Sequence, residues 1–184
     1  ASDVYKRQDL DNGMKIVEEI QAAGGEAIDV PTDVADEEAC ASMVDSTVRA
    51  FGKVDILVNN AAVFTSVERK PFTDILVAEW DQLMAVNVKG VWLCCKAVVP
   101  EMRKHSYGKI INIATGRIFK GAPFFLHYDA SKAAVVGITR SLAREVGDDN
   151  ICVNAIAPGS TMSENNRKRA NWKGGGTENT RSAR

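Results

Sequence analysis

Metal-ligand clusters, disulfide frameworks and long hydrophobic runs are all missing from this sequence of 184 residues. The four cysteines include no CxxC pair, and the two histidines do not stand at a metal-ligand spacing. The most apolar stretch, 91–99, is interrupted by Lys96 and is far shorter than the roughly 20 residues that cross a bilayer. We therefore expect no metal, no disulfide scaffold and no membrane partner, and a cytoplasmic location.

An excess of charge of one sign is also missing. The chain has 23 basic and 24 acidic residues, so nothing in its net charge attracts a nucleic acid or an anionic membrane. Residues 163–184 carry six basic residues against two acidic ones, but Trp172 is their only aromatic residue, which does not favour nucleic-acid binding. With 45% hydrophobic residues, the chain fits one globular domain that acts on a small molecule.

The two ends of the sequence differ from the middle. Residues 1–8 resemble an in-frame translation of a transposon end used in sequencing libraries, although an ordinary polar segment is the alternative. Residues 164–184 lose hydrophobic periodicity and contain a glycine triplet that follows no strand, so this segment is either a frameshifted end or a flexible loop. The domain is expected between residues 9 and 163.

Helix and strand patterns alternate between these ends. Helices are expected at 12–23, 36–51, 77–104 and 128–146, and strands at 26–30, 56–58, 109–113 and 152–157. The strand at 56–58 is continuously apolar, which is typical of parallel strands buried on both faces. The sequence therefore predicts an α/β fold with a doubly wound parallel sheet and helices on both faces.

The main candidate for chemistry is the pair formed by Tyr128 and Lys132. A spacing of four on a helix places the phenol and the ammonium on one face. A free tyrosine titrates near 10, so proton transfer near pH 7 requires about 4 kcal/mol of stabilisation for the phenolate. One cation at about 4 Å supplies this at an effective dielectric constant of about 20. The pair can therefore work as a proton shuttle.

Five further segments accompany this pair in a fixed order. They are Asp33-Val34, Asn59-Asn60-Ala61-Ala62, Asn87 in a helical context, Thr115 after a strand, and the run from Asn154 to Thr161. In this order the segments resemble the short-chain dehydrogenase/reductase family over residues 9–163. The resemblance implies an NAD- or NADP-dependent oxidoreductase that interconverts an alcohol and a ketone or aldehyde by hydride transfer. It also implies a Rossmann-like sheet that lacks its first two strands and its C-terminal strand.

The family also implies roles for the candidate catalytic residues. Tyr128 would exchange a proton with the substrate oxygen, and Lys132 would lower the pKa of Tyr128 and orient a cofactor ribose. Thr115 stands where the family usually has serine, and its hydroxyl can still hydrogen-bond the substrate oxygen. Asn87 would hold a water molecule that connects Lys132 to solvent.

Cofactor contacts are implied at the ends of two strands. Asp33 and Val34 would contact the adenine. Asn59 would brace the strands, and Asn60, followed by Ala61, would lie near the ribose; the next residue is alanine where the family usually has glycine.

A third group of contacts follows the last expected strand. Pro158 and Gly159 would begin the loop that passes the nicotinamide, and Thr161 would contact its carboxamide. The sequence contains no TGxxxGxG turn to hold a pyrophosphate at a helix N-terminus. Cofactor affinity of this chain is therefore expected to be poor.

Several alternatives stay open. The epimerase/dehydratase branch of the family uses the same Tyr-Lys pair, and a non-catalytic NAD(P)-binding regulator could share the fold. The phenylalanines before Tyr128 wall either a substrate pocket or an interface, and the neighbouring His127 is a weaker acid/base candidate. Neither the substrate nor the choice between NAD and NADP can be assigned, although Asp9 or Asp11 could contact a free ribose hydroxyl.

The resemblance also implies assembly and stability properties. The helices at 77–104 and 128–146 would form the interface of a homodimer or homotetramer. Without the two central strands, the strand at 26–30 has no neighbour and the strand at 56–58 becomes an exposed edge, which favours aggregation.

Overall fold

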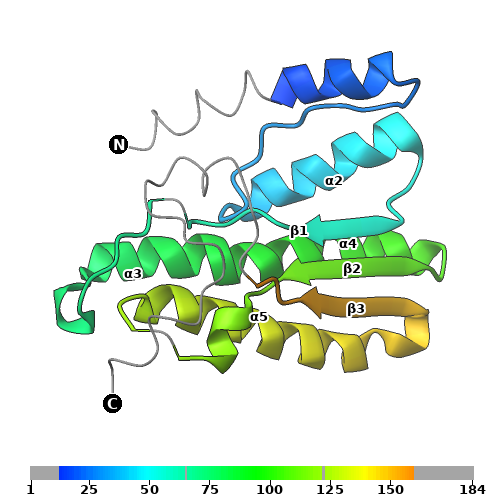
Figure 1. Ribbon diagram of the computed structural model, residues 1–184. Helices are drawn as coiled ribbons and strands as arrows, with labels where there is room; N and C mark the ends of the chain where they lie inside the picture. The colour runs from blue at the N-terminus through cyan, green and yellow to red at the C-terminus, as the bar shows by residue number, and fades with distance from the viewer. Residues whose placement is uncertain (1–12, 65, 122, 160–184) are drawn as a thin grey trace.

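The computed structural model describes residues 13–64, 66–121 and 123–159. At its centre lies a parallel sheet with the strand order β1-β2-β3. The strands are β1 (Ile56–Asn59), β2 (Gly108–Ile113) and β3 (Ile151–Ile156). All three point in the same direction, so their carboxyl ends meet at one edge of the sheet (Figure 1). The predicted α/β class and parallel sheet are confirmed.

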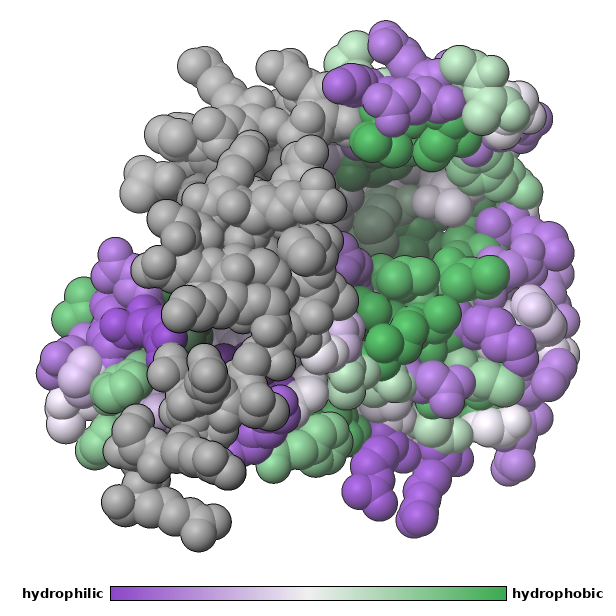
Figure 2. Space-filling model, in the orientation of Figure 1, coloured by the Kyte–Doolittle hydropathy of each residue, from purple (hydrophilic) through white to green (hydrophobic). Residues whose placement is uncertain are grey.

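Four of the described helices cover one face of this sheet. They are α2 (Glu37–Phe51), α3 (Val77–Met84), α4 (Gly90–Lys104) and α5 (Leu126–Glu145). Helix α4 packs on β1 and β2, α5 packs on β2 and β3, and α2 lies against α4 (Figure 1). Right-handed crossovers between strands added in one direction place every connecting helix on the same side. A further helix, at 13–22, lies on the side of the opposite face, across a hollow from the sheet (Figure 2).

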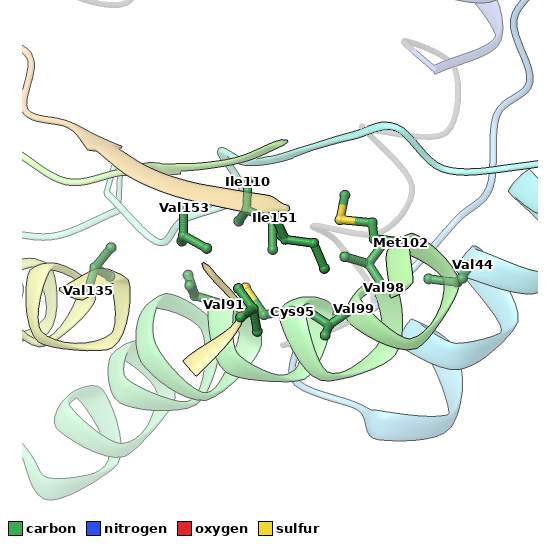
Figure 3. Packing of buried hydrophobic residues seen from close by; sticks show 11 residues of the cluster. Val44, Val91, Cys95, Val98, Val99, Met102, Ile110, Val135, Ile151 and Val153 are labelled. Carbon is green, nitrogen blue, oxygen red and sulfur yellow. The ribbon is translucent and has the colours of Figure 1, made fainter. Parts of the chain in front are cut away.

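The hydrophobic core lies between the sheet and α4. Ile110, Ile151 and Val153 point from the strands toward Val98 and its neighbours on α4 (Figure 3). These side chains are nearly or fully inaccessible to solvent. The core therefore fixes α4 and α5 against the sheet, and with them the start of α5, where Tyr128 lies.

The opposite face of the sheet is apolar and exposed. Ile56 and Val58 on β1 are 59% and 52% exposed, and Ile156 on β3 is also exposed. Figure 2 shows a hydrophobic hollow on this side, between the helix at 13–22 and the sheet. Strand β1 pairs only with β2 among the described strands, so the predicted exposed apolar edge is confirmed.

The expected strand at 26–30 is not formed. Residues 25–33 carry no strand hydrogen bonding in the structure. A strand is stable only when a neighbour pairs with its backbone groups, and the described chain offers none at this position. The prediction that segment 26–30 has no neighbouring strand is confirmed, but its assignment as a strand was wrong.

Helix α2 begins and ends where its capping residues predict. The carboxylate of Asp36 accepts a hydrogen bond from the backbone N–H of Ala39 at 2.8 Å and so satisfies a free N–H of the first turn. Gly52 ends the helix with φ +83°, a conformation that glycine adopts without strain. Three residues before this N-cap, the carboxylate of Asp33 accepts a hydrogen bond from the backbone N–H of Ala35 at 2.9 Å.

The long helix predicted at 77–104 is continuous but not regular. A π-helical turn, η2 (Ala85–Lys89), joins α3 to α4; such turns are frequent at functional sites. Among the described residues this is the one helix long and apolar enough to cross a membrane. Half of its apolar window is buried inside the protein, as in the core helix of a folded domain.

Candidate active site

Tyr128 and Lys132 lie one turn apart near the start of α5, and both are buried. The ammonium of Lys132 donates a hydrogen bond to the backbone carbonyl of Ile113, at the end of β2, at 2.7 Å. No carboxylate of the described residues pairs with it. Burial lowers the pKa of Lys132. A buried cation with remaining N–H donors therefore stands at the carboxyl edge of the sheet.

The phenol of Tyr128 packs in an apolar cluster. Its ring centroid lies 4.9 Å from that of Phe64, and the cluster also contains Val67, Leu83 and Phe125. Burial raises the pKa of Tyr128 above that of free tyrosine because an apolar environment disfavours the phenolate.

Two charged neighbours act on this phenol in opposite directions. The positive charge of Arg117 opposes the rise in the pKa of Tyr128, whereas the negative charge of Asp129 adds to it. Lys132, which was expected to lower this pKa, is not among the groups that act on it, and its ammonium is bonded to the Ile113 carbonyl. Sequence reasoning missed Arg117.

Thr115 ends the segment that follows β2 and begins the short helix η3 (Gly116–Phe119). Its hydroxyl oxygen accepts a hydrogen bond from the backbone N–H of Arg117 at 3.3 Å. The hydroxyl proton therefore remains available as a donor. Helix η3 packs on α5, so Thr115 and Tyr128 belong to adjoining elements.

Asn87 is fully buried in η2 and joins three segments. Its side-chain oxygen accepts from the N–H of Val63 at 2.8 Å, and its amide nitrogen donates to the carbonyl of Val63 at 3.2 Å. The same nitrogen donates to the hydroxyl of Ser131 at 3.2 Å. Ser131 in turn donates to the backbone carbonyl of Tyr128 at 2.7 Å. Asn87 thus ties the loop after β1 to the first turns of α5.

A second polar network joins the strands beneath the site. The amide of Asn59 donates to the side-chain oxygen of Asn112 at 2.8 Å, and Asn112 donates to the hydroxyl of Thr139 at 2.9 Å. Because Asn59 and Asn112 are partners in the register of β1 and β2, this contact braces the two strands, as expected for Asn59. Asn112 and Thr139 were missed, although an asparagine inside an apolar strand signals such a network.

Three of the other candidates, which follow β1 or precede α2, lie at the surface. Asp33, Asn60 and Ala61 are exposed. The side chain of Val34 packs against Gly90, where an added Cβ would lie 2.9 Å from the Val34 Cγ2. Glycine at position 90 therefore permits the close approach of Val34 to α4.

Pro158 and Gly159 follow β3 and lie beside Thr115. The carbonyl of Pro158 accepts from the N–H of Gly116 at 2.9 Å. The loop after β3 is thus hydrogen-bonded to the turn that carries Thr115. Thr161, Asp9, Asp11 and the segments 1–8 and 164–184 lie outside the described residues.

The aromatic residues and the histidine before Tyr128 separate into different environments. Phe125 is buried beside Tyr128, whereas Phe119 and Phe124 are exposed. His127 is buried, and its Nδ1 has no hydrogen-bond partner among the described residues. Burial lowers the pKa of His127, which fits a neutral packed side chain better than an acid/base group.

These residues fit the nicotinamide side of a dinucleotide. The ammonium of Lys132 is buried, pairs with no carboxylate of the described residues and has N–H groups left to donate to a ribose hydroxyl. The ends of β1, β2 and β3 meet beside it, where open α/β sheets bind ligands. For the pyrophosphate side, the sequence offers no glycine-rich turn.

Comparisons with known proteins agree with this arrangement. The family model described as short chain dehydrogenase matches residues 4–174. The chain is 39% identical over 153 residues to 2-dehydro-3-deoxy-D-gluconate 5-dehydrogenase of Dickeya dadantii (strain 3937), covering 83% of this chain and 59% of that protein. The chain thus spans about three fifths of the length of this relative.

Solved structures are similar as well. NAD+-bound xylitol dehydrogenase superposes with a TM-score of 0.78 at 34% identity, over 84% of this chain and 60% of that one. The NADP-bound protein ElxO superposes with a TM-score of 0.69 at 34% identity, over 73% of this chain and 53% of that one. The chain belongs to the short-chain dehydrogenase/reductase family of NAD(P)-dependent oxidoreductases.

Proposed function

We propose that the protein interconverts an alcohol and a ketone or aldehyde, with Tyr128 and Lys132 as its acid/base pair and NAD or NADP as its cofactor. The observation that carries the proposal is the buried Lys132 ammonium, which lies one turn from Tyr128 without a carboxylate partner among the described residues. Burying a cation without such a partner is costly, so a functional role accounts for it better than a structural one. A cytoplasmic location is part of the proposal.

In this proposal, some residues of the site transfer the proton and others position the reacting groups. Tyr128 gives a proton to the substrate oxygen in reduction and takes it back in oxidation. Thr115 donates its free hydroxyl proton to the same oxygen. Lys132 favours the phenolate once its ammonium turns from the Ile113 carbonyl toward the phenol. Bound NAD(P) supplies the hydride chemistry.

Asn87 and the cofactor contacts complete the proposal. Asn87 retains one lone pair on its side-chain oxygen, which can hold a water molecule on the path to Lys132. The proposed cofactor contacts are Asp33, Val34, Asn60, Ala61, Pro158, Gly159 and Thr161. This assignment is supported by position: those of the contacts that the structure describes lie at or beside the carboxyl edge of the sheet, or just before α2.

We also propose a homodimer or homotetramer built on the long helix and α5. A groove between them is lined by Trp92, Lys96, Ile138 and Leu142. Trp92 is half exposed, and the Lys96 ammonium lies over its ring, 5.4 Å from the ring centroid. A tryptophan in such a groove is a typical anchor of a protein interface.

The test uses the full-length protein that contains this sequence and the segments that its relatives have in addition. Tyr128→Phe should reduce turnover by more than about 100-fold and leave cofactor affinity nearly unchanged, because the hydroxyl acts on the substrate. Tyr107→Phe, at an exposed tyrosine, is the matched control. Turnover within tenfold of the unaltered protein would refute the assignment.

The alternatives give different results in the same assay. A non-catalytic regulator would bind NAD(P) but turn over no alcohol or ketone in a broad panel. A member of the epimerase/dehydratase branch would act on nucleotide sugars instead.

A further inference from the structure

The side chain of Arg117 joins the two elements that carry the substrate-facing hydroxyls. It lies in η3, two residues after Thr115. Its Nε donates to Oδ1 of Asp129 at 3.0 Å, and its Nη2 donates to Oδ2 of the same carboxylate at 3.4 Å. Its guanidinium carbon lies 4.5 Å from the centroid of the Phe125 ring. Both partners belong to the start of α5, on either side of Tyr128 in sequence.

The backbone of Arg117 makes the second connection. Its N–H donates to the hydroxyl oxygen of Thr115 at 3.3 Å and so leaves the hydroxyl proton as the group that can point to a substrate. One residue thus orients Thr115 through its main chain and holds the first turn of α5 through its side chain. The ion pair with Asp129 is only 31% and 16% exposed, so solvent screens it less than an ordinary surface pair.

We propose that Arg117 is a positioning residue of this active site, which fixes the separation between the hydroxyls of Thr115 and Tyr128 by clamping η3 to the start of α5. The inference rests on the function proposed above. Arginine suits this task better than lysine because a planar guanidinium can bind a carboxylate with two nitrogens and stack on an aromatic ring at the same time.

The clamp also sets the charge around the phenol. Arg117 favours the phenolate form of Tyr128, and Asp129 disfavours it. From the same helix, Lys132 is bonded to the Ile113 carbonyl. From the remaining packed segments the phenol meets the apolar side chains of Phe64, Val67 and Leu83.

Other charged groups nearby are paired with each other. Glu79 of α3 bonds Lys70 at 2.7 Å, and both act on the buried His127. The balance at Tyr128 therefore depends on Arg117 and Asp129 within the described chain.

The test compares four variants of the full-length protein. Arg117→Gln removes the charge, Arg117→Lys keeps the charge but not the two-point geometry, and Asp129→Asn removes the opposing charge. Arg69→Gln is the matched control, because Arg69 lies over the same Phe125 ring at 5.8 Å and is exposed. The first readout is the pH profile of kcat/KM for alcohol oxidation.

The second readout does not depend on activity. NMR titration of labelled tyrosine Cζ, with the Tyr128 signal assigned by its absence from Tyr128→Phe, reports the pKa of Tyr128 directly. This readout remains informative if the protein oxidises no alcohol, which separates failure of the proposed function from failure of this inference.

Opposite changes are expected from the two charge-removing variants. Arg117→Gln should raise the midpoint for Tyr128 by roughly 0.5 to 1 pH unit, and Asp129→Asn should lower it by a similar amount. Arg117→Lys should leave the midpoint near that of the unaltered protein but reduce kcat about tenfold, because a shift of the reacting groups slows the chemical step. Midpoints that do not move, or that move in the same direction in Arg117→Gln and Asp129→Asn, would overturn the inference, as would equal losses in Arg69→Gln.

Discussion

Replacement of Asn87 by alanine should destabilise the protein and loosen the loop beside Tyr128. The variant loses three hydrogen bonds, two to the backbone of Val63 and one to the hydroxyl of Ser131. At about 1 kcal/mol for each bond, the free energy of unfolding should fall by about 3 kcal/mol. Because Val63 precedes the Phe64 ring that packs on Tyr128, its amide should also exchange with solvent faster.

The assay is urea denaturation of the full-length protein combined with amide hydrogen exchange. Asn60→Ala is the control. Asn60 is exposed directly after β1, at the start of the loop that Asn87 holds, and its replacement should change stability by less than about 0.5 kcal/mol. If Asn87→Ala unfolds at the same urea concentration as the unaltered protein, and the Val63 amide keeps its protection, the bracing role of Asn87 is refuted.

Three further results are expected. Thr115→Ser should keep or raise turnover, and Thr115→Ala should reduce transition-state stabilisation by about 1 to 3 kcal/mol. Both effects are measured by steady-state kinetics. An alanine variant with unchanged turnover would show that another group holds the substrate oxygen. Trp92→Ala should weaken self-association, measured by sedimentation velocity, whereas Phe72→Ala, at an exposed position away from the groove, should not. A full-length protein that is monomeric at all concentrations would contradict the proposed interface. The 184-residue chain alone should aggregate and show no dehydrogenase activity; a soluble, cooperatively folded chain with micromolar NAD(H) affinity would refute that expectation.

Local signals in the sequence were sufficient for most elements. Asp36 and Gly52 mark the ends of α2 because capping depends on the residue at the cap itself. The helix that carries Tyr128 and Lys132 was also predicted, within two residues of its observed start. Such features depend on a few neighbouring residues, so a sequence pattern can reveal them.

Features that depend on distant partners were harder to predict. The segment 26–30 has the pattern of a strand, but strand formation needs a pairing neighbour. The role of Arg117 was missed because it depends on a contact with Asp129, twelve positions away in the chain, at a position where no motif required an arginine. The π-helical turn likewise gave no compositional signal.

The π-helical turn η2 makes the exact length of the segment 77–104 important. A π turn contains one residue more than an α turn, and one residue corresponds to a rotation of about 100° around a helix axis. This extra rotation lets Leu83 of α3 face Tyr128 while Val91 and Val98 of α4 face the sheet core. Deletion of one residue within 85–89 would restore a regular helix, but it would turn one of these two faces away from its partner. Variation in this segment is therefore restricted to substitutions, because insertions and deletions would separate the site from the core that supports it.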